Sequence, residues 1–133
     1  MNNGMATSKI LVVDDDPKLS RLVATILNRV GGYDVLEENR PFAALATARQ
    51  FRPDLILLDV DMPGKDGGAI SRELGDDALL SRVPVIFVTS LISKSEAGVH
   101  HGVRYLAKPV DPHLLLDTVR SLCPRFKPEP QLA

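Results

Sequence analysis

The sequence predicts an α/β domain in which helices cover both faces of a parallel β-sheet. Five short segments with the character of strands alternate with segments in which apolar residues recur at helical spacing. Residues 10–13 and 55–58 are apolar at every position, which is typical of strands that are buried on both faces. Strands that alternate with helices in this way form parallel sheets, because each helix returns the chain to the same end of the sheet.

Length, composition and charge are those of one ordinary globular domain. The chain has 133 residues, of which 44% are hydrophobic, and its net charge is −1. Acidic and basic residues are interspersed, so no surface for nucleic acid is indicated. The apolar runs are too short to span a bilayer, and residues 1–8 lack the apolar core of a signal peptide. The single cysteine, Cys123, cannot form an internal disulfide, and these features together predict a cytoplasmic protein without membrane insertion.

The apolar pattern places strands and helices in alternation along the chain. The expected strands cover about residues 9–13, 33–36, 55–59, 83–88 and 104–107. The expected helices cover about residues 17–30, 41–50, 67–74 and 112–122. Between the last two strands, Gly98 and Gly102 favour only an irregular or shortened helix. His100 and His101 lie in this segment, and we expect a solvated loop rather than a metal site, because adjacent histidines do not share one helix face.

Local sequence marks the ends of the helices. Asp16 and Asp111 each precede a proline, and aspartate is a favoured N-cap while proline suits the first helical position. Gly31 and Gly32 are expected to end the first helix. Several prolines make the residues after the last helix non-helical. We therefore expect a disordered leader at residues 1–8, one domain at residues 9–123 and a proline-rich tail at residues 124–133.

Chemistry-bearing residues follow four of the five expected strands. Right-handed crossovers favour the flavodoxin-like, doubly wound order 2-1-3-4-5 for five parallel strands, and open sheets of this kind bind ligands at the carboxyl ends of their strands. The residues at those ends are Asp14 and Asp15 after the first strand, Asp59 after the third, Thr89 after the fourth and Lys108 after the fifth. Neighbouring strands lie about 4.8 Å apart, so these side chains are expected to meet over one point.

The segments that carry these residues resemble the motifs of response-regulator receiver domains, the phosphoacceptor modules of two-component signalling. The matching segments are residues 10–16, 57–64, 88–90 and 105–109. No single motif is decisive, but their order and their positions at strand ends make the resemblance specific. It implies a bacterial phosphorylation switch that receives a phosphoryl group from a histidine kinase or a phosphotransfer protein. Its output would be contact with a downstream protein target, either as a stand-alone receiver or as an excised domain.

The resemblance also implies a metal-dependent phosphoacceptor. Asp59 would accept the phosphoryl group in a reaction that needs Mg²⁺, or Mn²⁺ in its place. The ion would be held by Asp15, Asp59 and the backbone carbonyl of Asp61, while Asp14 would act largely through metal-bound water. Mg²⁺ binds few carboxylates and keeps several waters, which suits this set of ligands.

Further residues are implied to contact the phosphoryl group or to transmit its presence. Lys108 would neutralise one phosphoryl oxygen, and Thr89 would donate a hydrogen bond to another. Tyr105 would then turn inward into the space that Thr89 leaves. The family usually has a cis peptide bond that aims the lysine, here between Lys108 and Pro109, and cis bonds are essentially a proline feature.

Two other functions are alternatives. The segment Asp59-Val60-Asp61 resembles the nucleophile motif of haloacid-dehalogenase-type phosphatases, in which the second aspartate acts as acid–base. That family usually has the motif near the N-terminus and its acidic pair later, whereas the order here is reversed. A receiver-like scaffold that is never phosphorylated is the other alternative, and the complete acidic set argues against it. We therefore expect no enzyme activity beyond self-phosphorylation from donors and self-dephosphorylation.

Overall fold

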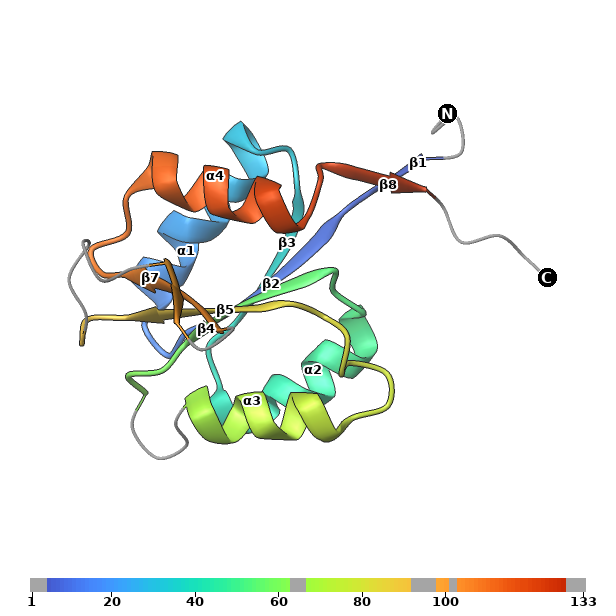
Figure 1. The fold of residues 1–133 in the computed structure, drawn as a ribbon, viewed down its shortest axis with the longest axis vertical. Helices are drawn as coiled ribbons and strands as arrows, with labels where there is room; N and C mark the ends of the chain where they lie inside the picture. Colours follow the sequence, from blue (N-terminus) through green and yellow to red (C-terminus); the bar gives the residue numbers. More distant parts are fainter. Residues whose placement is uncertain (1–4, 63–66, 92–97, 101–102, 129–133) are drawn as a thin grey trace.

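A mostly parallel sheet forms the framework of the protein (Figure 1). The computed structural model describes residues 5–62, 67–91, 98–100 and 103–128. Its parallel strands are β2 (Lys9–Val13), β3 (Asp34–Glu38), β4 (Leu55–Asp59), β5 (Val85–Thr89) and β7 (Val103–Ala107). Within the described residues, a short strand β6 (Gly98–His100) pairs antiparallel with β7 and completes the order β3-β2-β4-β5-β7-β6. The parallel strands thus have the order 2-1-3-4-5, which confirms the predicted fold class.

Helices cover both faces of this sheet. They are α1 (Pro17–Thr25) with its π-helical continuation η1 (Ile26–Val30), the short η2 (Pro41–Ala43), α2 (Ala44–Phe51), α3 (Gly67–Asp76) and α4 (Pro112–Leu122). Figure 1 shows α1 and α4 on one side of the sheet and α2 and α3 on the other. Among the described residues, no helix has the length and the apolar character needed to cross a bilayer.

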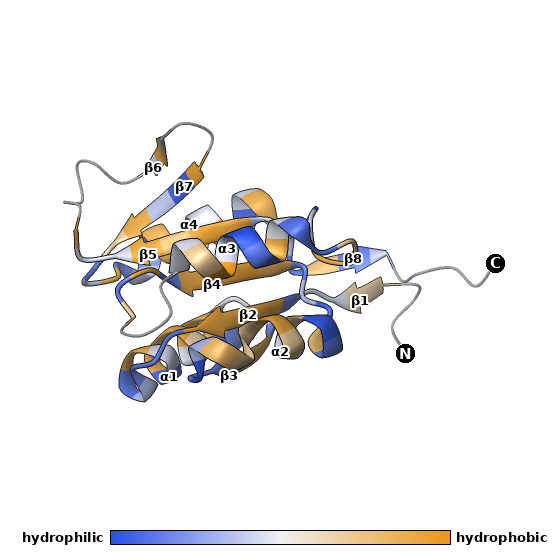
Figure 2. Cartoon of the chain, turned by 90° about the horizontal axis from the view of Figure 1, so that it is seen from below, coloured by the Kyte–Doolittle hydropathy of each residue, from blue (hydrophilic) through white to orange (hydrophobic). Residues whose placement is uncertain are grey.

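The unbroken apolar runs serve two hydrophobic cores, one on each face of the sheet. Successive side chains of a strand point to opposite faces, so Ile10 and Val12 pack with α1 and α4. Leu11 and Val13 pack instead with α2 and α3. All residues of β4 are buried. In Figure 2 the central strands β2, β4 and β5 are almost entirely hydrophobic, whereas the helices also carry hydrophilic residues.

The predicted helix caps are present. The Asp16 side chain accepts a hydrogen bond from the backbone N–H of Lys18 at 3.0 Å. The Asp111 side chain accepts hydrogen bonds from the first backbone N–H groups of α4. Gly32 follows η1 with φ of 76°, a conformation that glycine adopts without strain. These contacts determine where the chain enters α1 and α4 directly after the sheet edge.

Residues 5–7 of the expected disordered leader are ordered. Instead of a disordered segment at residues 1–8, residues Met5–Thr7 form β1, which pairs antiparallel with β8 (Phe126–Pro128) (Figure 1). The Ser8 N–H donates to the Arg125 carbonyl at 2.9 Å, and the Lys127 ammonium lies 2.6 Å from the Asp54 carboxylate. Because β1 directly precedes β2, this two-stranded ribbon lies at the amino end of β2, opposite the carboxyl ends of the parallel strands. The pairing joins segments about 120 residues apart, and no local pattern reveals it.

The described part of the segment between Thr89 and Lys108 contains a short strand. Residues 98–100 form β6, with Gly98 opposite Tyr105 and His100 opposite Val103. His100 therefore ends a strand instead of lying in a solvated loop. The predicted irregular helix and His101 fall on residues 92–97 and 101–102, outside the described part of the chain. Backbone pairing with β7 satisfies hydrogen-bonding groups of β6.

Candidate functional site

The register of the sheet brings the predicted site residues to one edge. Val13 pairs with Leu58, which places Asp14 beside Asp59 at the carboxyl ends of β2 and β4. On the other side of β4, Asp59 lies opposite Val88. Thr89 in turn lies opposite Ala107, the residue before Lys108. The four strand ends that sequence analysis singled out therefore converge.

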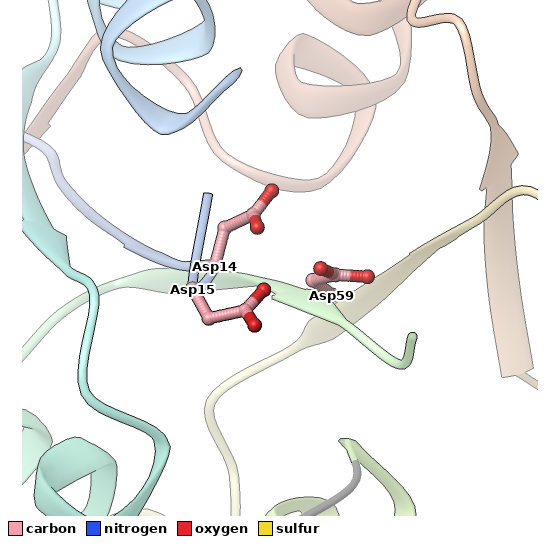
Figure 3. A group of neighbouring side chains, drawn as sticks. All are labelled: Asp14, Asp15 and Asp59. Atoms are coloured by element: carbon pink, nitrogen blue, oxygen red, sulfur yellow. The ribbon is translucent and has the colours of Figure 1, made fainter. Parts of the chain in front are cut away.

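An acidic cluster occupies the centre of this edge. One carboxylate oxygen from each of Asp14, Asp15 and Asp59 lies within 4.8 Å of the other two. Figure 3 shows the Asp14 and Asp15 side chains at the end of β2 and the Asp59 side chain next to them at the end of β4. Asp14 is 5% exposed and Asp59 4% exposed, while Asp15 is half-buried. Oxygen ligands in this number are what a hard divalent cation such as Mg²⁺ takes from a protein.

Burial of like charges perturbs the titration of Asp14. Loss of hydration and the neighbouring Asp59 carboxylate raise the pKa of Asp14 from 3.8 to about 7. The Asp16 N–H, which donates to Asp14 Oδ1 at 2.9 Å, and the Lys108 charge offset only part of this effect. The cluster therefore holds more negative charge than its surroundings compensate, which is the electrostatic condition for binding a cation.

Lys108 supplies the positive charge beside the cluster. Its Nζ donates to Asp59 Oδ1 at 3.0 Å and lies 3.6 Å from Asp61 Oδ2. Burial lowers the pKa of Lys108, but the hydrogen bond and charge of Asp59, with Asp14 and Asp61, raise it above its ordinary value. The ammonium thus stays charged at neutral pH. The Lys108–Pro109 peptide bond is cis, as the resemblance implied.

The Asp61 carboxylate has a role that sequence analysis missed. It accepts a hydrogen bond from Thr89 Oγ1 at 2.9 Å on one oxygen. Its other oxygen accepts from the Ser90 N–H at 2.8 Å and from Ser90 Oγ at 2.9 Å. Burial raises the pKa of Asp61, but these hydrogen bonds and Lys108 lower it below its ordinary value. The resemblance to receiver domains implied a role only for the backbone carbonyl of Asp61, and no spacing rule indicates where its side chain points.

Tyr105 lies on the same face of the sheet as the residue that pairs with Thr89. It precedes Ala107 by two positions on β7, and Ala107 is the partner of Thr89. Its ring is half-buried, with its centroid 5.4 Å from that of Phe87 at an interplanar angle of 33°. Tyr105 therefore packs against β5 through Phe87, two residues before Thr89.

Comparison with known proteins agrees with this geometry. The family described as response regulator receiver domain matches residues 10–120. Protein PilH of Pseudomonas aeruginosa is 37% identical over 118 residues, which are 86% of this chain and 97% of PilH. RpaA of Synechocystis, a DNA-binding dual master transcriptional regulator, is 38% identical over 94% of this chain, which spans about half of RpaA (53%).

Solved structures give the same result. The chemotaxis protein CheY4 of Vibrio cholerae superposes with a TM-score of 0.76 at 29% identity, over 88% of this chain and 99% of CheY4. The agreement covers the parallel sheet and its helices on both faces, so it extends beyond the motifs at the strand ends. The chain therefore belongs to the response regulator receiver domains of two-component signalling.

Proposed function

We propose that the acidic edge of the sheet is a phosphoacceptor site in which Asp59 receives a phosphoryl group from a histidine kinase or a phosphotransfer protein. The observation that carries this proposal is the convergence of Asp14, Asp15 and Asp59, with Lys108 hydrogen-bonded to Asp59. In the transfer, a P–O bond forms to a carboxylate oxygen of Asp59 as the bond from phosphorus to the donor nitrogen breaks. Such a reaction depends on positioning and electrostatics, which these side chains provide.

A divalent cation fits the donor set of this site. Asp15, Asp59 and the backbone carbonyl of Asp61 would hold Mg²⁺ or Mn²⁺, and Asp14 would contact metal-bound water. When bound, the ion offsets the repulsion between the anionic donor and the carboxylates. The raised pKa of Asp14 supports this assignment, because burial and the neighbouring Asp59 carboxylate both disfavour its negative charge and a bound cation would relieve that cost.

Lys108 and Thr89 would recognise the product. The Lys108 ammonium now donates to Asp59 Oδ1 and would turn to a phosphoryl oxygen once negative charge moves there. Thr89 would donate its hydroxyl hydrogen to a second phosphoryl oxygen. Displacement of Thr89 would leave space that the Tyr105 ring fills, and the altered surface would bind a downstream protein target in the cytoplasm.

The phosphatase alternative is less well supported by the geometry. It needs Asp61 as a proton donor to the leaving group. The Asp61 carboxylate is instead engaged by Thr89 and Ser90, and its lowered pKa makes it a poor acid at neutral pH. The role that fits best is a phosphoacceptor switch whose own chemistry is limited to self-phosphorylation and self-dephosphorylation.

Labelling with a small phosphodonor tests the proposal. Wild-type protein, Asp59→Asn and the control Asp16→Asn are incubated with acetyl phosphate and Mg²⁺ and analysed by intact mass spectrometry. Asp16 is an exposed cap, and asparagine caps a helix equally well. We expect one phosphoryl adduct on wild type and Asp16→Asn, none on Asp59→Asn, and none on any protein in EDTA. An adduct on another residue, or labelling without a divalent cation, would contradict the assignment.

A further inference from the structure

The Asp61 carboxylate accepts the hydrogen bond of the Thr89 hydroxyl, the group that the proposed switch needs for the phosphoryl group. We propose that Asp61 is a positioning residue that holds Thr89 and Ser90 while Asp59 is unphosphorylated and releases Thr89 when Asp59 is phosphorylated. The three hydrogen bonds that Thr89 and Ser90 donate to the Asp61 carboxylate are called the Asp61 bridge below. The inference rests on the proposed function, in which Thr89 contacts the phosphoryl group.

The first step of the argument is the hydrogen count at Thr89. A threonine hydroxyl has a single hydrogen to donate. Thr89 Oγ1 donates that hydrogen to Asp61 Oδ1 at 2.9 Å, and Thr89 Oγ1 itself accepts a hydrogen bond from the Leu91 N–H at 3.1 Å. Thr89 therefore cannot donate to a phosphoryl oxygen on Asp59 until its bond to Asp61 breaks. The two acceptors compete for one proton.

Ser90 strengthens the bridge. Its backbone N–H and its hydroxyl both donate to Asp61 Oδ2, at 2.8 and 2.9 Å. Hydrogen bonds to a carboxylate are stronger than those between neutral groups. The bridge thus joins the last residue of β5 and the residue after it to the segment after β4 by three hydrogen bonds. Ser90 and Leu91 are both exposed. An exposed segment held by a few side-chain bonds has the properties of a two-state element.

Lys108 links the bridge to the phosphoacceptor. Its Nζ lies 3.0 Å from Asp59 Oδ1 and 3.6 Å from Asp61 Oδ2, between the two carboxylates. A doubly charged phosphoryl group on Asp59 attracts this ammonium more strongly than Asp61 does. Asp61 then loses its cation at the same time as it loses the Thr89 hydrogen. Weakening the bridge in advance therefore lowers the cost of switching.

Ser90→Ala is the cleanest perturbation. It removes one hydrogen bond of the Asp61 bridge, leaves every charge in place and alters a side chain that is exposed. Asp61→Ala removes the whole bridge but also one negative charge. Asp34→Ala, which removes an exposed carboxylate on the distant strand β3, is the matched control. The probe is beryllofluoride with Mg²⁺, a non-covalent phosphoryl analogue, titrated while backbone amide resonances are recorded by NMR.

Weakening the bridge should make beryllofluoride binding tighter. The midpoint of the titration should fall roughly three- to tenfold in Ser90→Ala and at least as far in Asp61→Ala. It should stay unchanged in Asp34→Ala. Without beryllofluoride, hydrogen exchange of the Ser90 amide should be faster in Asp61→Ala than in wild type, because its acceptor is gone.

Two results would overturn the inference alone, and a third would overturn the proposed function with it. If Asp61→Ala binds more tightly while Ser90→Ala equals wild type, the effect of Asp61 is charge alone and the bridge does not oppose switching. An unchanged exchange rate of the Ser90 amide in Asp61→Ala would likewise overturn it. If the wild type neither binds beryllofluoride nor is labelled on Asp59 by acetyl phosphate, the proposed function itself is wrong, and the inference falls with it.

Discussion

Replacing Asp14 with asparagine should stabilise the metal-free protein at neutral and alkaline pH. Burial and the neighbouring Asp59 raise the pKa of Asp14 from 3.8 to about 7. Between these values the folded protein binds a proton that the unfolded chain has already lost. The free energy of unfolding therefore falls as the pH rises from about 4 to about 7. Above about pH 7 the destabilisation by Asp14 has reached its full value and stays constant. Asparagine removes this cost and still accepts the Asp16 N–H through Oδ1.

The size of the effect follows from the two pKa values. At about 1.4 kcal/mol for each pH unit, the difference between the folded and unfolded pKa values of Asp14 lowers the free energy of unfolding by about 4 kcal/mol above pH 7. Because Asp15 and Lys108 beside Asp14 are partly exposed and water screens their charges, we expect a smaller gain of about 2 kcal/mol. The gain should shrink toward about pH 4, where Asp14 is protonated in both states. It should also shrink in Mg²⁺, because the wild type binds the ion more tightly and is stabilised more.

Urea denaturation followed by circular dichroism measures this effect. Wild type, Asp14→Asn and the control Asp16→Asn are compared in EDTA at about pH 8 and about pH 4, and again at about pH 8 with Mg²⁺. Asp16→Asn should match the wild type throughout. If Asp14→Asn proves less stable than wild type in EDTA at about pH 8, Asp14 does not share a repulsive pocket with Asp59, and the electrostatic reasoning is refuted.

Three further substitutions test the packing around the site and at the opposite end of the sheet. Tyr33→Phe removes the buried 2.6 Å hydrogen bond from the tyrosine hydroxyl to the Cys123 carbonyl, so urea denaturation should show a loss of about 1 kcal/mol; equal stability would contradict this. Gly67→Ala places a methyl group 2.7 Å from the backbone oxygen at the end of β4. It should lower both stability and labelling by acetyl phosphate, and a stable, fully labelled variant would count against this reading. Lys127→Met removes the ion pair to Asp54, so amides of β1 and β8 should exchange faster than in the wild type, while those of β2 should not change. If amides of β1 and β8 exchange at the wild-type rate, the ion pair does not stabilise the ribbon.

Much of the fold could be predicted because its signals are local. The apolar runs of β2 and β4 indicate strands buried on both faces, and both are buried in the structure. Asp16 and Asp111 predict helix starts because an N-cap needs only a short side chain and the next two or three N–H groups. The candidate site followed from one rule, that parallel strands bring their carboxyl ends to one edge, together with the residue types found there.

Pairings between distant segments were beyond local reasoning. The pairing of β1 with β8 depends on the chain returning past the amino end of β2 after α4, which no short pattern in residues 5–7 encodes. The same holds for β6, since Gly98 reads as a helix breaker and becomes a strand residue only because β7 lies beside it. Strand formation depends on a partner, whereas helix formation is satisfied within one segment.

Residue types and their order along the chain were enough to assign the class of fold, the strand order and the acidic edge, because periodicity and chain connectivity are properties of the sequence. The direction of the Asp61 carboxylate and the placement of Lys108 between two acids were decided by tertiary structure. A side chain turns toward whichever donors neighbouring strands present, and the groups at Asp61 come from the carboxyl ends of β5 and β7, far from Asp61 in sequence.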